Sequence, residues 1–91
     1  MKTKAHVLIS GHVQGVFFRS ETKHEAEKHN VTGQIRNLPD GRVEATFEGE
    51  QKDVEKLIEF CRTGPPAAKI KTVTVTWQTY SGKYPDFEIT Y

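Results

Sequence analysis

The residue types best suited to bind an anion lie in one stretch of nine residues near the N-terminus. They follow an apolar run expected to be a strand and precede a charged run expected to begin a helix. A loop at this place can bind phosphate, because the first amides of a helix have no internal partner and the helix dipole is positive there. In order, the stretch is Gly11, His12, Val13, Gln14, Gly15, Val16, Phe17, Phe18 and Arg19.

Three residues of this stretch have side chains or backbones that suit anion binding. Gly11 and Gly15 let the backbone turn and bring successive N–H groups towards a ligand. The guanidinium of Arg19 can hold phosphate or carboxylate through two parallel hydrogen bonds. Two glycines and one arginine are weak evidence, however, and their spacing alone favours an ordinary connection with a surface arginine.

Asn37 is the second candidate for chemistry. It lies near the end of an expected strand, on the same face as Ile35 and two residues before a turn. An asparagine that points towards a core needs partners, because an unpaired buried amide is costly. Asn37 is either a residue that initiates the turn, which is common, or an amide that holds a water or an oxyanion. Only the glycine-containing stretch favours the second interpretation.

Other residues with chemical potential do not form a recognised site. His24 and His29 lie on one expected helix, but a metalloprotease helix needs a spacing of four residues. Cys61 falls on an apolar helical stripe, which favours a buried, inert thiol. No Gly-Lys-Ser/Thr follows the glycine-containing stretch, which is not a dinucleotide-binding fingerprint either, so nucleotide hydrolysis with magnesium is not indicated. No cluster of Asp or Glu suggests a metal site.

The elements that must position these residues follow from hydrophobic periodicity. Apolar residues recur every three or four positions in the expected helix 51–62, and Pro39-Asp40-Gly41 is typical of a tight hairpin turn. The expected strands are Lys4–Ser10, Gln34–Leu38, Arg42–Glu48, Ile70–Thr79 and a last one with Phe87, Ile89 and Tyr91. The expected helices are Ser20–His29 and Gln51–Arg62.

Two of these strands show which side chains should face the core. In the strand 42–48, Val43, Ala45 and Phe47 point one way. The polar residues that point the other way, to water, are Arg42, Glu44, Thr46 and Glu48. In the strand 70–79, Trp77 faces inward with the valines, and the threonines face outward.

The order of the elements predicts an α+β fold. A β-α-β-β-α-β order with one-sided strands is typical of the ferredoxin-like sandwich, an antiparallel sheet with two helices on one face, here with a short extra C-terminal strand. This fold hosts enzymes, metabolite sensors and RNA binders, so it does not by itself define a function.

Length and charge restrict the partners. The 91 residues make one domain over positions 1–91. A net charge of +1 gives no overall attraction to nucleic acid or an anionic membrane, so neither is expected as a partner. The single cysteine fits a reducing compartment, and neither a signal peptide nor a run of about 20 apolar residues is present. We therefore expect a cytoplasmic protein, and a monomer given its small size and balanced charge.

Together the two stretches resemble the acylphosphatase family. The residues that carry the resemblance are Gly11-x-Val13-Gln14-Gly15-Val16-x-Phe18-Arg19 and Gly33-x-x-x-Asn37-x-x-x-Gly41-x-Val43, with Gly49 following. In this order and separation the pair is highly specific, and the resemblance covers essentially the whole chain. The sequence departs from the family at Gln34, where an aromatic residue is usual, and Ile35 is larger than the usual neighbour.

The resemblance implies hydrolysis of an acyl phosphate to a carboxylate and inorganic phosphate, without metal or cofactor. Arg19 and the loop amides would bind the phosphoryl group, with inorganic phosphate or sulfate as alternative anions at the site, and Asn37 would orient the attacking water. Two other functions remain open. One is an RNA-binding module, which the charge balance and the absence of outward aromatic residues on the strands disfavour. The other is a regulatory domain that binds an anion without turnover.

Overall fold

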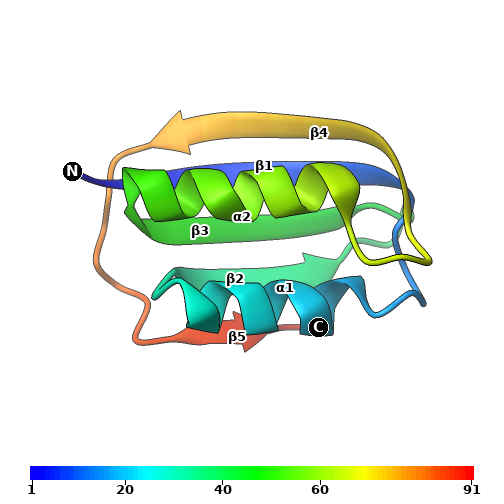
Figure 1. The fold of residues 1–91 in the computed structure, drawn as a ribbon, viewed down its shortest axis with the longest axis horizontal. Helices are drawn as coiled ribbons and strands as arrows, with labels where there is room; N and C mark the ends of the chain where they lie inside the picture. The colour runs from blue at the N-terminus through cyan, green and yellow to red at the C-terminus, as the bar shows by residue number, and fades with distance from the viewer.

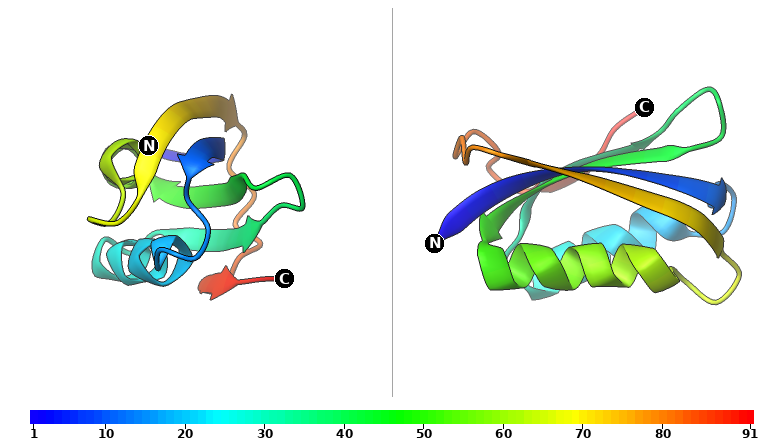
Figure 2. Two further views of the ribbon diagram at one scale, coloured as in Figure 1. Left: turned by 90° about the vertical axis from the view of Figure 1, so that its right-hand side faces the viewer. Right: turned by 90° about the horizontal axis from the view of Figure 1, so that it is seen from above.

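The computed structural model describes all 91 residues, and its two helices pack on one face of a five-stranded sheet (Figures 1 and 2). The ferredoxin-like α+β prediction is confirmed, with the sheet order β4-β1-β3-β2-β5. Neither helix combines the length and apolarity that crossing a membrane requires. The elements are β1 (Lys2–His12), α1 (Phe18–Lys28), β2 (Thr32–Asn37), β3 (Val43–Glu50), α2 (Gln51–Thr63), β4 (Lys69–Gln78) and β5 (Phe87–Ile89).

The short strand β5 makes the sheet mixed. The strands β1 to β4 pair antiparallel with their neighbours, as expected, but β5 pairs parallel with β2. The reason is the connection between β4 and β5, which stays at the end of the sheet where β4 finishes (Figure 1). The chain therefore enters β5 from the same end as β2 and runs in the same direction. This pairing brings the C-terminal residues alongside β2.

The core lies between the sheet and the helices. The alternation in β3 is confirmed, because Val43, Ala45 and Phe47 are buried on the helix side. The expected face of α2 is also buried, and it consists of Val54, Leu57, Ile58 and Cys61. Complete burial raises the pKa of the Cys61 thiol to about 12, so this cysteine is protonated at neutral pH and has the inert character expected of it.

Thr46 and Glu48 correct the prediction that the polar side chains of β3 face water, because both are buried. Glu48 is the more consequential of the two. Its side chain is fully buried, because the connection between β4 and β5 folds over that end of the sheet. The Glu48 carboxylate accepts hydrogen bonds from the N–H and hydroxyl of Ser81, both at 2.7 Å, and from the N–H of Gly82 at 3.1 Å. Three donors replace the water that the carboxylate loses, so the burial is tolerated.

Trp77 corrects a second expectation. It lies on the helix side of β4 with Val73 and Val75, as its alternation predicts, but the side chain is 48% exposed. The cause is the place of β4 at the edge of the sheet, where α2 covers only part of the strand. A period of two residues tells which face a side chain takes, but not whether another element covers that face.

Candidate active site

The glycine-containing stretch forms a shorter loop than the sequence suggested. Strand β1 continues to His12, and α1 begins at Phe18 rather than Ser20, so the connection is the segment 13–17, here called the cradle loop. Gly11 and His12 lie in β1, where they pair with Ile70 and Lys69 of β4. A Cβ atom at Gly11 would lie 2.1 Å from the Lys69 carbonyl oxygen, so this glycine is required by strand packing.

The backbone of the cradle loop is bent by two residues in the left-handed region. Gly15 has φ 75°, which glycine adopts without strain. Phe17, the N-cap residue of α1, has φ 64°, which costs a residue other than glycine about 1–2 kcal/mol. None of the N–H groups from Gln14 to Ser20 donates a hydrogen bond to another protein atom. The loop and the helix terminus therefore present a series of free donors.

Gln14 ties the cradle loop to the hairpin between β2 and β3. Its side-chain Nε2 donates to the carbonyl oxygens of Leu38 at 2.8 Å and Arg42 at 3.0 Å. The expected tight turn is present, with Gly41 at φ 96° and the Leu38 N–H bonded to the Arg42 carbonyl at 2.8 Å. Gln14 thus fixes the loop relative to the turn that immediately follows Asn37. The sequence suggested a place in the loop for Gln14 but not this side-chain contact.

Replacing Gln14 with alanine should loosen this connection. The variant loses two hydrogen bonds, while the Leu38 and Arg42 carbonyl oxygens keep their backbone donors, so we expect a loss of about 1–3 kcal/mol in the free energy of unfolding. We also expect weaker inhibition by inorganic phosphate, because the loop is no longer held beside Asn37. Urea unfolding and phosphate inhibition measure the two effects. Unchanged values for both would show that the contact does not position the loop.

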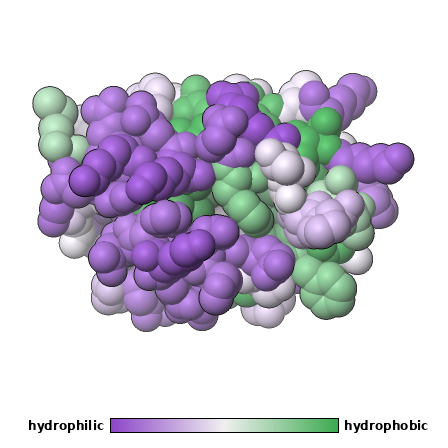
Figure 3. Space-filling model, in the orientation of Figure 1, coloured by the Kyte–Doolittle hydropathy of each residue, from purple (hydrophilic) through white to green (hydrophobic).

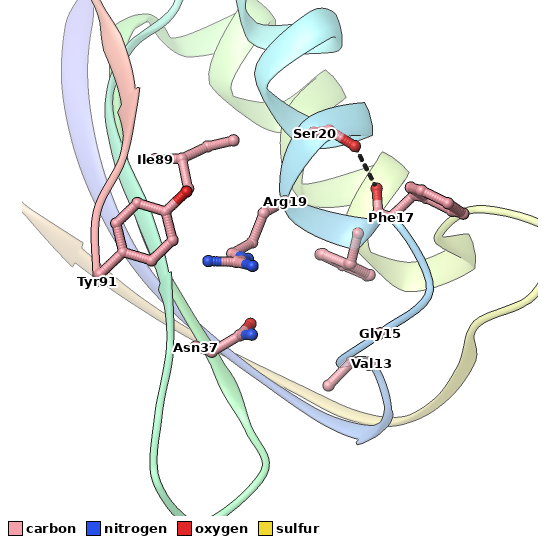
Figure 4. A pocket seen from close by; sticks show the side chains of 9 residues that line it. Val13, Gly15, Phe17, Arg19, Ser20, Asn37, Ile89 and Tyr91 are labelled. Carbon is pink, nitrogen blue, oxygen red and sulfur yellow. Dashed lines mark hydrogen bonds between the residues drawn. The ribbon is translucent and has the colours of Figure 1, made fainter.

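Arg19 and Asn37, which the sequence places eighteen positions apart, point into the same pocket (Figure 4). The pocket has a volume of about 380 Å³. Arg19 is in the first turn of α1 and Asn37 is the last residue of β2. The lining residues are Val13, Gly15, Phe17, Phe18, Arg19, Ser20, Asn37, Ile89 and Tyr91.

Arg19 and Asn37 lack the protein partners that such side chains usually have. Arg19 forms no ion pair, and its guanidinium carbon lies 5.2 Å from the centre of the Tyr91 ring, a cation–π distance. Asn37 has a buried Oδ1 that accepts no hydrogen bond. No aspartate or glutamate lines the pocket. The pocket therefore combines a free positive charge, free amide donors and an unpaired acceptor.

Phe18 fixes the start of α1 and with it the direction of Arg19. The Phe18 side chain is buried, and its ring lies 6.3 Å from that of Phe60 on α2. Because successive side chains on a helix diverge by about 100°, burying Phe18 turns Arg19 towards the pocket. The pattern of an apolar residue followed by arginine therefore places a packing anchor next to a charged side chain that lines the pocket.

The unusual residues of β2 do not interrupt the strand. Gln34 is exposed, whereas Ile35 is fully buried in the core opposite Ala45. The pairing with β3 continues without a break to Asn37, which lies opposite Val43.

Ile89 and Tyr91 are pocket residues that sequence reasoning did not identify. Their alternation with Phe87 predicted a strand, but the sequence contains no signal that tells which strand of the sheet this last strand pairs with. The parallel pairing with β2 brings them beside Asn37. Elsewhere in the molecule, no group of three or more His, Cys, Asp or Glu side chains lies together as metal ligands would.

The sequence and the fold match one family along almost their whole length. The family model described as acylphosphatase matches residues 5–89. An acylphosphatase of Pelotomaculum thermopropionicum is 51% identical over 90 residues, covering 99% of this chain and 98% of the relative. The structure of an acylphosphatase from Coxiella burnetii has a TM-score of 0.92 and 37% identity, covering 98% of this chain and 93% of that chain. That of acylphosphatase from Bacillus subtilis has a TM-score of 0.94 and 32% identity, with 100% of both chains covered.

Proposed function

Because this chain belongs to the acylphosphatase family of hydrolases, we propose that the pocket of Arg19 and Asn37 hydrolyses the carboxyl–phosphate bond of small acyl phosphates. The observation that carries the proposal is the free guanidinium of Arg19 in one pocket with the buried, unpaired Oδ1 of Asn37.

The phosphoryl group binds in the concave side of the cradle loop. The free N–H groups of the loop and of the first turn of α1 donate to its oxygens, and the positive end of the helix dipole adds to the attraction. Arg19 completes the site with two parallel hydrogen bonds. Because these donors are fixed before the substrate arrives, they stabilise charge on the phosphoryl oxygens without reorganisation.

Asn37 holds the attacking water. Its Oδ1 is an acceptor without a partner, so it can accept a hydrogen bond from a water placed beside the phosphorus. The water oxygen forms a bond to phosphorus, and the bond between phosphorus and the carboxyl oxygen breaks. The carboxylate leaves with the electron pair, and a proton of the water passes to a phosphate oxygen. The products are RCOO⁻ and H₂PO₄⁻ from RCOOPO₃²⁻ and H₂O.

The chemistry requires little beyond positioning and charge stabilisation. A carboxylate is a good leaving group, so strong acid catalysis is unnecessary. In a loose transition state the attacking water does not need early deprotonation, so no strong base is required. The rest of the rate acceleration comes from holding the water and the phosphoryl group next to each other in the orientation that the reaction needs.

Removing divalent metal ions should leave the activity unchanged, because Arg19 and the amides supply the positive charge. The measurement is the hydrolysis of benzoyl phosphate with and without EDTA. Activity that EDTA removes and magnesium restores would contradict the proposal. A folded protein that binds phosphate without hydrolysis would instead be a regulatory anion-binding domain, and a salt-sensitive shift of RNA in a gel would indicate an RNA-binding module.

A further inference from the structure

Phe17 combines two features that both oppose folding. Its backbone is in the left-handed region, with φ 64°, and its side chain is 79% exposed. The left-handed conformation follows from the shape of the cradle loop, but that shape does not require an aromatic side chain. The ring points away from Arg19, to the outside of the pocket (Figure 4). An exposed aromatic ring at the rim of a site is a candidate for contact with a ligand.

A second hollow, of about 390 Å³, lies on the outer side of Phe17. It shares the wall residues Phe17 and Ser20 with the pocket of Arg19, so the two hollows are adjacent. Hydrophobic surface is visible at the right-hand end of the molecule in Figure 3, the end at which the loop between β1 and α1 lies in Figure 1. The exposed faces of the helices are mostly hydrophilic. The lining residues are Val16, Phe17, Ser20, Glu21, Pro65, Pro66 and Ala67.

The direction of the leaving group follows from in-line displacement. The attacking and leaving oxygens lie on opposite sides of the phosphorus. Asn37, which holds the water, lies on the same side of the pocket as Ile89 and Tyr91, and the cradle loop lies on the other side (Figure 4). A leaving group directed away from Asn37 therefore passes over the cradle loop towards Phe17.

We propose that the second hollow binds the acyl group of the substrate, against the apolar surface of Phe17, Pro66 and Ala67. The inference rests on the proposed roles of Arg19 and Asn37. It assigns to the enzyme a preference for acyl phosphates with an apolar, uncharged acyl group. Glu21 is the single charged residue of the hollow. Its negative charge repels any acyl group that carries a carboxylate of its own, so such substrates are disfavoured.

The test compares kcat/KM for benzoyl phosphate with that for acetyl phosphate, which shares the reacting group but lacks the ring. Phe17→Ala should lower the benzoyl-to-acetyl ratio about three- to tenfold, the effect of exposing part of one aromatic ring. Phe17→Leu, which keeps an apolar side chain, should retain most of the ratio. Any change in the cradle affects both substrates and cancels in the ratio.

A second pair of variants avoids the cradle loop. Ala67 is exposed in the turn before β4. Ala67→Glu adds a second carboxylate to the hollow, and Ala67→Gln is the matched uncharged control. We expect Ala67→Glu, but not Ala67→Gln, to raise the KM for succinyl phosphate, whose acyl group carries a carboxylate. Glu21→Gln should lower that KM about two- to threefold, as expected for one partly screened charge.

An unchanged benzoyl-to-acetyl ratio in Phe17→Ala would overturn the proposal, and so would a loss of that ratio in Tyr91→Ala alone, which would place the acyl group on the Tyr91 side. Either result leaves the proposed function intact if acetyl phosphate is still hydrolysed in an Arg19-dependent way. Absence of hydrolysis of both substrates in the wild type would instead contradict the proposed function itself.

Discussion

Replacing Arg19 with alanine is expected to lower kcat/KM for benzoyl phosphate about a thousandfold or more, equivalent to about 4 kcal/mol of transition-state stabilisation. Arg19 carries the only charged side chain that lines the pocket, and it forms no ion pair with an aspartate or glutamate. The variant should therefore also lose inhibition by inorganic phosphate. Steady-state kinetics with phosphate as a competitive inhibitor measure both effects.

Arg19→Lys should recover little of this activity. Lysine keeps the charge but lacks the planar fork that holds two phosphoryl oxygens at once. Arg62→Ala is the matched control, because Arg62 lies on α2 outside the pocket. Normal phosphate inhibition in Arg19→Ala would contradict the assignment of the phosphate site. Loss of activity in Arg62→Ala would indicate an effect of charge or stability instead.

Replacing Asn37 with alanine should lower kcat about a hundred- to a thousandfold, the usual range for removing one positioned polar group. Phosphate inhibition should change little, because the amides and Arg19 remain. The variant should unfold at the same temperature as the wild type or a higher one, since the removed Oδ1 is buried without a hydrogen bond. A lower activity combined with unchanged or higher stability is the signature of a residue kept for function.

Asn30→Gly is the matched control for Asn37. Asn30 is exposed at the end of α1 with φ 56°, a conformation that glycine adopts readily. Its replacement should leave kcat unchanged. An equal loss of kcat and phosphate inhibition in Asn37→Ala would mean that Asn37 binds phosphate, and a large drop in melting temperature would mean that it supports the fold.

Local patterns predicted the elements well because local physics decides them. The apolar stripe of α2 can be buried only as a helix, and Pro39-Asp40-Gly41 closes a hairpin in almost any context. The boundaries near the site were less accurate. The prediction began the first helix at Ser20, whereas α1 starts at Phe18, because burial of the Phe18 ring against Phe60 outweighs the weak capping signal of Ser20.

The two motifs contained the candidate groups but not their surroundings. Arg19 and Asn37 were identifiable from the sequence through the glycine-containing stretch and the family resemblance. The side-chain contact of Gln14 was not, because its acceptors are backbone carbonyls of a distant hairpin. The burial of Glu48 was also not predictable, because its donors come from the connection that follows β4.

The sequence by itself determined the elements, their order, the family and the two polar side chains proposed for catalysis, since these depend on residue type and short spacing. Only the tertiary structure decided that the last strand pairs with β2, that Ile89 and Tyr91 form a wall beside Asn37, and that Phe17 lies between two adjacent hollows. The reason is physical. Strand partners and pocket walls are chosen by contacts between residues far apart in the chain, and a period of two or 3.6 residues carries no information about them.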